Sequence, residues 1–250
     1  MFQSIKKAIM KHSILYKILV TPLNIVRKID IFGNLVKLFQ YGIIKRGIFR
    51  DFFLYQPIYG GKSREFRRKS EDRWNKMKEH LPKTPFSFMD IGCNIGYFTF
   101  SAQNEGAVAI GVEMHPGRYE LAQAIKVINK VERVSFFNFE IDKNTVMGLP
   151  SVNVICCLSV YHHWVRQLGF EEADEIFTSL CNKTDSIFFE TGQPDEKVQW
   201  KGMLDFMGSD VKGWIEEYLK SKGFESMVML GEFSTHRSDV PRHLFFASKV

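Results

Sequence analysis

The most constraining feature of the sequence is an apolar stretch that ends in an acid and then turns at two glycines. Residues 86–100 read F-S-F-M-D-I-G-C-N-I-G-Y-F-T-F, with Asp90 ending the apolar run and Gly92 and Gly96 in the turn. Glycines let backbone approach a ligand closely, and the helix expected after the turn presents unpaired N–H groups. The segment therefore predicts a ligand-binding loop between a buried strand and a helix.

The rest of the chain alternates between strand-like and helix-like patterns. Apolar runs end at Ile91, Glu113, Phe139, Leu158 and Thr191, and helical patterns lie near residues 95–104, 116–129, 167–181 and 208–223. A charged helix is expected at about 63–80, and two more strands at 226–230 and 243–248. This alternation predicts an α/β fold, in which helices cover both faces of a parallel sheet. The closing pair of strands would add an antiparallel edge strand.

The positive charge of the chain is concentrated at its beginning. Residues 1–50 contain ten lysines and arginines and one acid, whereas the whole chain has a net charge of +6, so the remainder is net negative. We expect residues 1–50 to form a basic amphipathic helical extension, which either lies on an anionic membrane surface or packs its apolar stripe on the domain. The net negative remainder does not favour general nucleic-acid binding.

Four cysteines lack both zinc-binding spacing and a disulfide framework: Cys93, Cys156, Cys157 and Cys181. They are expected to be buried reduced thiols, which fits a cytoplasmic protein. The sequence also lacks an apolar run of about 18 residues that could span a membrane. These features predict a cytoplasmic location, with peripheral contact at the inner membrane face through the extension as an open possibility.

The spacing of the loop separates two classes of nucleotide ligand. The pattern is D-x-G-x-x-x-G, with Asn94 where a dinucleotide-binding loop has its middle glycine. Asp90 would repel a pyrophosphate, whereas it can either hold an ammonium group or order the loop. Glu113 ends the second strand, where a carboxylate can accept both hydroxyls of an adenosine ribose. The pattern favours S-adenosylmethionine (SAM) over a nicotinamide cofactor.

This segment resembles the first motif of the Rossmann-like SAM-dependent methyltransferases, and Glu113 matches their ribose-binding acid. The resemblance implies a seven-stranded sheet whose last strand is antiparallel. It also implies a cofactor site made of the loop, its flanks and an acid near the adenine. The residues expected there besides Asp90, Gly92, Gly96 and Glu113 are Cys93, Asn94, Tyr97, Phe98, Met114, Glu140 and Leu158.

A narrower resemblance involves two other segments. Residues 152–164 read V-N-V-I-C-C-L-S-V-Y-H-H-W, and residues 231–248 contain G-E-F-S-T-H-R-S-D-V-P-R. Together with Tyr55-Gln56-Pro57 they are similar to the methyltransferase half of the bacterial O-antigen chain-terminating kinase–methyltransferases. The resemblance spans about residues 53–250 and implies that residues 51–82 cover the cofactor, with Tyr55, Gln56 and Arg73 folding over SAM. It further implies O-methylation of a phosphoryl or sugar oxygen of a cell-surface glycan or its precursor.

Histidines and arginines supply the candidates for acceptor chemistry. His162 and His163 follow the fourth strand, at the carboxyl edge where open α/β sheets place their sites, and His236 lies in the tail motif. These three are predicted as catalytic residues, and a hydroxyl acceptor needs a base of this kind whereas a phosphate does not. A metal site is not expected, since adjacent histidines on a strand edge should diverge. Arginines predicted to bind an anionic substrate are Arg64, Arg68 and Arg242.

Two alternatives remain open from the sequence. The first is an RNA or small-metabolite methyltransferase, in which Arg46 and Arg50 beside Phe49, Phe52 and Phe53 would contact phosphates and bases. The second is a catalytically silent partner that only binds SAM. Binding without turnover would distinguish that case from an enzyme.

Overall fold

The computed structural model describes residues 56–59, 68–235, 238 and 240–249, so the predicted extension over residues 1–50 lies outside the described part. The helices are α3 (Arg68–Met77), α4 (Tyr97–Asn104), α5 (Pro116–Ile128), α6 (Tyr161–Leu168), α7 (Phe170–Cys181) and α8 (Val211–Ser221). Short 3₁₀ helices are η2 (Lys78–His80), η3 (Thr145–Gly148) and η4 (Asp205–Met207). The strands are β1 (Ser87–Ile91), β2 (Val108–Val112), β3 (Val134–Phe137), β4 (Val152–Leu158), β5 (Thr184–Glu190), β6 (Ser226–Phe233) and β7 (Arg242–Ser248).

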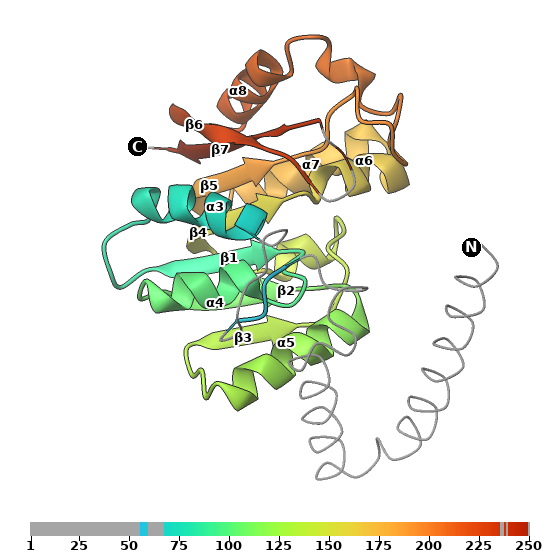
Figure 1. Ribbon diagram of the computed structural model, residues 1–250. Coiled ribbons are helices and arrows are strands. Elements are labelled where there is room, and N and C mark those ends of the chain that lie inside the picture. The colour runs from blue at the N-terminus through green and yellow to red at the C-terminus, as the bar shows by residue number, and fades with distance from the viewer. Residues whose placement is uncertain (1–55, 60–67, 236–237, 239, 250) are drawn as a thin grey trace, which may run out of the picture. The chain divides into compact units, whose positions relative to one another are not determined.

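The seven strands form one mixed sheet in the order β3-β2-β1-β4-β5-β7-β6 (Figure 1). Strands β1 to β5 are parallel, and β7 is antiparallel to both of its neighbours. This confirms the predicted seven-stranded sheet with an antiparallel last strand. The expectation that the antiparallel strand lies at the edge is wrong, because Ser248 of β7 pairs with Ser186 of β5 on one side and with Ser226 of β6 on the other. Strand β6 is therefore the edge strand.

The strand order reverses between β1 and β4. The chain runs from β1 outward to β2 and β3, then crosses back to β4 and continues to β5 on the other side. Residues 88–91 of β1 are all buried, as expected for a central strand covered on both faces. The carboxyl ends of β1 and β4 meet at the reversal, which is the usual place for a ligand in an open α/β sheet.

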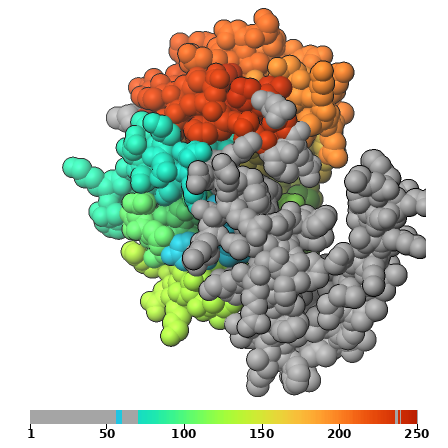
Figure 2. Space-filling model, viewed as in Figure 1, coloured from blue at the N-terminus to red at the C-terminus, as the bar shows by residue number. Residues whose placement is uncertain are grey.

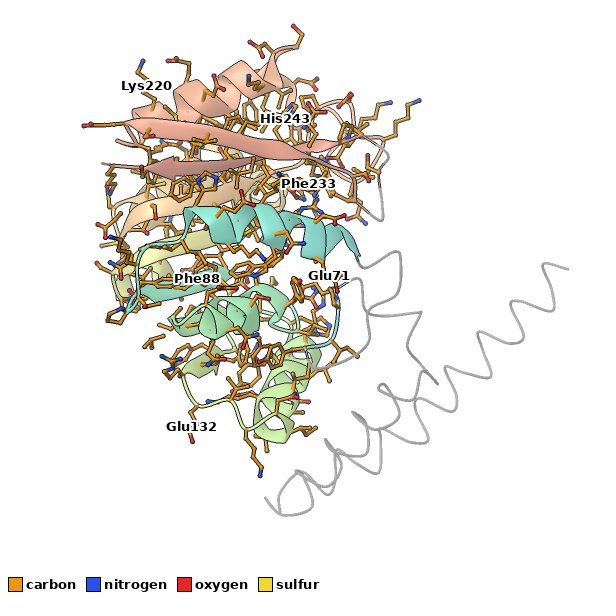
Figure 3. All side chains as sticks on the ribbon, turned by 60° about the vertical axis from the view of Figure 1, so that its left-hand side comes forward. Glu71, Phe88, Glu132, Lys220, Phe233 and His243 are labelled. Atoms are coloured by element: carbon orange, nitrogen blue, oxygen red, sulfur yellow. The ribbon has the colours of Figure 1, made fainter. Side chains whose placement is uncertain are left out.

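Helices cover both faces of the sheet. Helix α3 packs on α4 and on β6, and in the space-filling view its side chains lie between those of the C-terminal strands and those of α4 (Figures 2 and 3). The other face carries α6 and α7, whose Tyr161, Trp164 and Phe177 share a core with Met89 and Ile91 of β1. All four cysteines are free and buried, as predicted. No helix in the described ranges is long and apolar enough to cross a membrane.

The helix expected at about 167–181 is α7, and it is preceded by α6, which the sequence did not predict. Gly169, with φ 88°, separates α6 from α7. His162 and His163 consequently lie in the first turn of α6 and not on a strand edge. The expected divergence of their rings is also wrong, since the ring centroids are 4.3 Å apart. The ring of Trp200 packs against both imidazoles and holds them on the same side.

Candidate functional site

The loop after β1 has a backbone that requires its glycines. Gly92 and Gly96 have φ values of 67° and 85°, and Asn94 between them has a φ of 56°, which asparagine tolerates better than most residues. A Cβ on Gly92 would lie 2.7 Å from a methyl group of Val160, and one on Gly96 would lie 2.6 Å from the ring of Phe136. The loop is therefore fixed tightly between β2, β3 and the start of α6.

Glu113 is hydrogen-bonded to this loop. Its carboxylate is buried and accepts hydrogen bonds from the backbone N–H groups of Asn94 and His115, each at 2.8 Å. A carboxylate oxygen can accept more than one hydrogen bond, so each oxygen retains acceptor capacity. The next residue, Met114, is about half exposed, as is Phe137 at the end of β3. An acid and two apolar side chains thus border the loop at one edge of the sheet.

Asp90 connects β1 to the helix after the loop. Its carboxylate accepts a hydrogen bond of 2.8 Å from the hydroxyl of Thr99 in α4. Burial raises the pKa of Asp90 to about 7, although the hydrogen bonds with Thr99 act in the opposite direction. Of the two functions considered for this acid, the geometry is that of a residue that orders the loop.

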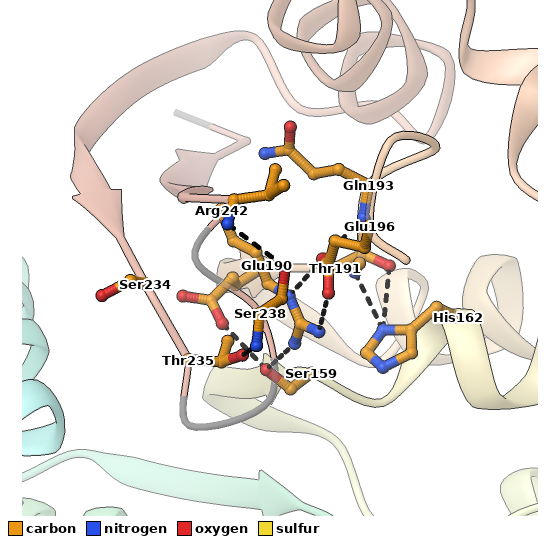
Figure 4. A network of polar contacts seen from close by, with 12 residues as sticks. Ser159, His162, Glu190, Thr191, Gln193, Glu196, Ser234, Thr235, Ser238 and Arg242 are labelled. Carbon is orange, nitrogen blue, oxygen red and sulfur yellow. Dashed lines mark hydrogen bonds and ion pairs between the residues drawn. The ribbon is translucent and has the colours of Figure 1, made fainter. Parts of the chain in front are cut away.

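A network of buried charges lies at the carboxyl ends of β4 and β5 (Figure 4). Arg73 of α3 donates from Nε to Glu190 at 2.6 Å, and its Nη2 contacts the carbonyl of Phe233 at 3.3 Å. Arg242 donates from Nε and Nη2 to the two oxygens of Glu196, at 2.7 and 2.8 Å. All four charged groups are nearly inaccessible to solvent, so each charge is compensated by a partner within the chain.

His162 is buried beside this network. Its Nδ1 accepts a hydrogen bond of 2.9 Å from the backbone N–H of Gly192, so the proton of the neutral imidazole is assigned to Nε2. Burial lowers the pKa of His162 well below its ordinary value, and the positive charge of Arg242 adds to the effect. A ring whose pKa is lowered and whose Nδ1 already accepts a hydrogen bond is a poor general base. The half-buried His163 lies next to it.

The structure brings together most of the residues predicted for the cofactor. The loop residues Gly92, Cys93, Asn94 and Gly96 lie with Tyr97 and Phe98 at the start of α4, and Met114 and Leu158 follow or end the neighbouring strands. Gln56 is buried, and its Oε1 has no hydrogen-bond partner in the described part of the chain. Glu140 is exposed in the segment after β3. Outside the description lie Tyr55, Arg64, His236 and the side chain of Arg68.

Two predicted arginines are paired with carboxylates. Arg73 is expected to fold over SAM and Arg242 to bind an anionic substrate. Both are buried in ion pairs, with Glu190 and Glu196 respectively. Their roles in binding stay predictions.

Sequence reasoning missed several residues of this network. Ser159 and Glu190 stand where β4 and β5 end, and polar residues at carboxyl strand ends are a recognisable signal. Glu196 and Trp200 lie in the irregular segment after β5, which has no periodic pattern that could have singled them out.

Comparison with known proteins agrees with the fold. No family model matches the chain. The O-antigen chain terminator bifunctional methyltransferase/kinase WbdD of Escherichia coli is 25% identical over 166 residues, which cover 66% of this chain and 22% of WbdD. A crystal structure of WbdD superposes with a TM-score of 0.64 at 22% identity, covering 82% of this chain and 47% of that one. The chain is thus similar in sequence to a methyltransferase and shares the fold of its solved structure.

Two further methyltransferases are similar. The tRNA U34 carboxymethyltransferase of Desulfotalea psychrophila (strain LSv54 / DSM 12343) is 30% identical over 135 residues, covering 52% of this chain and 40% of that protein. The N-terminal domain of EvdMO1, solved in the presence of S-adenosylhomocysteine (SAH) and D-fucose, has a TM-score of 0.57 at 14% identity and covers 84% of this chain and 96% of that one. The matched part spans only about a fifth of WbdD and two fifths of the tRNA enzyme.

Proposed function

We propose that this chain is a SAM-dependent O-methyltransferase that acts on a phosphoryl or sugar oxygen of a cell-surface glycan or its precursor. The main structural support for the cofactor assignment is the hydrogen bond that the backbone N–H of Asn94 donates to the carboxylate of Glu113. It joins the glycine loop and the acid at the end of β2 into one rigid unit. Such a unit can bind a ribose diol beside a close backbone approach.

The residues present fit SAM in three ways. Glu113 keeps acceptor capacity for ribose hydroxyls, and the exposed apolar side chains of Met114 and Phe137 offer an apolar surface for the adenine. Within the described ranges, the Oε1 of buried Gln56 has no donor, and a bound amine or hydroxyl would supply one. SAM supplies a methyl group on a sulfonium, which an oxygen nucleophile displaces in line.

The protein's own contribution is to orient the acceptor and, where it is a hydroxyl, to take its proton. Among the predicted histidines we assign the role of general base to His163. His162 is less suited, because its Nδ1 already accepts a hydrogen bond from Gly192 and burial lowers its pKa. A phosphoryl oxygen is already anionic and would need no base. The pairing of Arg73 and Arg242 with carboxylates leaves both kinds of acceptor open.

The glycan acceptor is supported by the similarity to WbdD, an O-antigen chain terminator by name. It is also compatible with the fold shared with EvdMO1, which was solved with a sugar and SAH. The acceptor is therefore a proposal from similarity, whereas the cofactor proposal also has a basis in the geometry of the loop.

Isothermal calorimetry with SAM, SAH and NAD tests the cofactor. We expect micromolar binding of SAM and SAH and none of NAD. Gly92→Ala should abolish binding, because the new Cβ lies 2.7 Å from Val160 at a φ of 67°. Gly202→Ala is the matched control, since its φ of 79° imposes a similar backbone strain but no atom of the described residues lies within 4 Å of the new Cβ. Binding of NAD alone, or full SAM binding by Gly92→Ala, would contradict the proposal.

The similarity to a tRNA carboxymethyltransferase favours a second candidate, an RNA-modifying enzyme. Transfer of radiolabelled methyl groups from SAM to phosphorylated glycans, unphosphorylated glycans and tRNA distinguishes the two. Label on either glycan supports our proposal, and label on tRNA alone would replace it. Cofactor binding without label on any acceptor would favour a silent SAM-binding partner.

A further inference from the structure

Ser159 occupies an unusual position between β4 and α6. Its φ of 61° is in the left-handed region, which residues other than glycine adopt rarely. Its backbone N–H donates to the carbonyl oxygen of Glu190 at 2.8 Å, so the strained backbone is tied to the end of β5. Strain of this kind persists where the surrounding structure determines it, and it concentrates at functional sites.

The hydroxyl of Ser159 joins the two buried ion pairs into a single network. It donates to Oε1 of Glu190 at 2.8 Å and accepts from Nη1 of Arg242 at 2.9 Å (Figure 4). Arg73 is bound to the other oxygen of Glu190, and Glu196 holds the rest of the Arg242 guanidinium. A continuous row of hydrogen bonds therefore runs from α3 to the segment after β5, and Ser159 is its middle member.

The chain neighbours of two network residues contact the glycine loop and the helix after it. Val160, which follows Ser159, packs so closely on Gly92 that no Cβ fits there. Trp74, which follows Arg73, packs on Phe98 in the first turn of α4 at a centroid distance of 6.3 Å. A ligand bound at the loop would therefore act on Ser159 through Val160 and on Arg73 through Phe98 and Trp74.

The other side of the network reaches the predicted acceptor side. The guanidinium of Arg242 lies over the ring of Trp200 at 5.2 Å. The centroid of that ring is 4.1 Å from the imidazole of His162 and 5.5 Å from that of His163. A shift in Arg242 would thus move the surface on which both histidines rest.

We infer that Ser159 is a positioning residue, whose hydroxyl couples the glycine loop to the segment that carries Glu196 and Trp200. This inference rests on the proposed function, because it assumes that the loop binds SAM or SAH. Ser159 itself touches neither reactant in this scheme. It transmits occupancy of the cofactor loop, through Glu190 and Arg242, to the side chains around the predicted base.

Fluorine NMR of the full chain labelled with 5-fluorotryptophan can test the coupling, because the chain has only four tryptophans. Trp74 lies next to the glycine loop and Trp200 at the far end of the network, and Trp74→Phe and Trp200→Phe assign their resonances. We expect saturating SAH to shift both resonances in the wild type. In Ser159→Ala it should shift that of Trp74 only, with loss of the Trp200 response.

Two further variants separate the hydroxyl from other effects. Ser159→Gly relieves the backbone strain and also lacks the hydroxyl, so the Trp200 response should be lost there too. Ser179→Ala is the matched control, because in the described part of the chain that hydroxyl donates to a carbonyl one turn earlier in α7 and to no other group, and it should keep both responses.

Several results would overturn the inference. A Trp200 response that persists in Ser159→Ala, or that returns in Ser159→Gly, would exclude the hydroxyl as the coupling group. A wild type in which SAH shifts Trp74 but not Trp200 would remove the coupling and leave the proposed function intact. A wild type that gives neither heat nor any shift with SAH would remove the proposed function, and the coupling with it.

Discussion

At the residue scale, ionisation of the buried, loop-ordering Asp90 lowers the stability of the fold. Its pKa of about 7 in the fold exceeds the ordinary value near 4 of an unfolded chain. The folded state consequently binds the proton more tightly, and this contribution to stability is complete below about pH 4 and is lost as the pH rises through 7. Above about pH 7, the cofactor-free protein therefore carries a buried carboxylate, to which Thr99 donates a hydrogen bond.

We therefore expect Asp90→Asn to raise the free energy of unfolding of the cofactor-free protein at pH 8 and to leave it nearly unchanged at pH 4. The gain at pH 8 should be on the order of 4 kcal/mol, because the pKa is raised from 3.8 to about 7 and each unit of a pKa shift corresponds to about 1.4 kcal/mol. Urea denaturation at both pH values measures the difference. An equal gain at pH 4 and at pH 8 would mean that the variant is stabilised by packing and not by the loss of an ionisable group.

At the element scale, helix α3 is attached to the sheet through a buried charge. Arg73 bonds to Glu190 of β5 and to the carbonyl of Phe233 at the end of β6, and its guanidinium also lies over the ring of Phe233. Removing one partner of a buried ion pair leaves the other uncompensated, which costs more than replacing both.

Arg73→Met should accordingly lower the free energy of unfolding by about 3 to 5 kcal/mol. Adding Glu190→Gln should restore at least half of that loss, because glutamine can still accept the hydrogen bond from Ser159 and carries no charge. Urea denaturation of the two single variants and the double variant provides the cycle. Strictly additive losses would show that the two side chains are not coupled.

The elements were largely predictable because each leaves a local pattern, and α6 was missed because it has no readable start signal. Its N-cap, Val160, makes no side-chain capping bond, and its first turn continues directly from the apolar residues of β4. By contrast, α5 begins with proline at its first position, which is a readable start signal. The network could not be predicted for a related reason, because Glu196 and Trp200 join it through tertiary contacts that no sequence periodicity encodes.

At the scale of the whole molecule, charge is divided between the extension and the remainder of the chain. Residues 1–50 are strongly basic and the rest is net negative. We propose that the extension brings the enzyme to an anionic membrane surface where glycan precursors are held. Each lysine near such a surface contributes about 1 kcal/mol, so a few substitutions should suffice to release the protein.

The test variant of the full chain replaces four lysines of the extension by glutamine, namely Lys6, Lys7, Lys11 and Lys17. In a flotation assay we expect this variant to separate from anionic vesicles. A matched control replaces four exposed lysines of the described domain, namely Lys78, Lys83, Lys143 and Lys201. The control should still float with the vesicles. Equal behaviour of both variants, or flotation with neutral vesicles, would exclude the proposed membrane role.

The sequence predicted the number and type of strands, but not where β7 lies. Residues 226–233 and 242–248 have strand patterns, yet nothing local states that the second of them enters between β5 and β6. That position is decided by pairing on both sides of β7, which is a property of the assembled sheet.

The insertion of β7 has a consequence for how the protein is made. Arg242 begins β7, so ribosomes synthesise it after every other strand of the sheet. Until it emerges, β5 has an open edge and Glu196 lacks its guanidinium partner. The glycine loop is therefore synthesised well before β7, and the acceptor side stays incomplete until β7 has been added to the sheet.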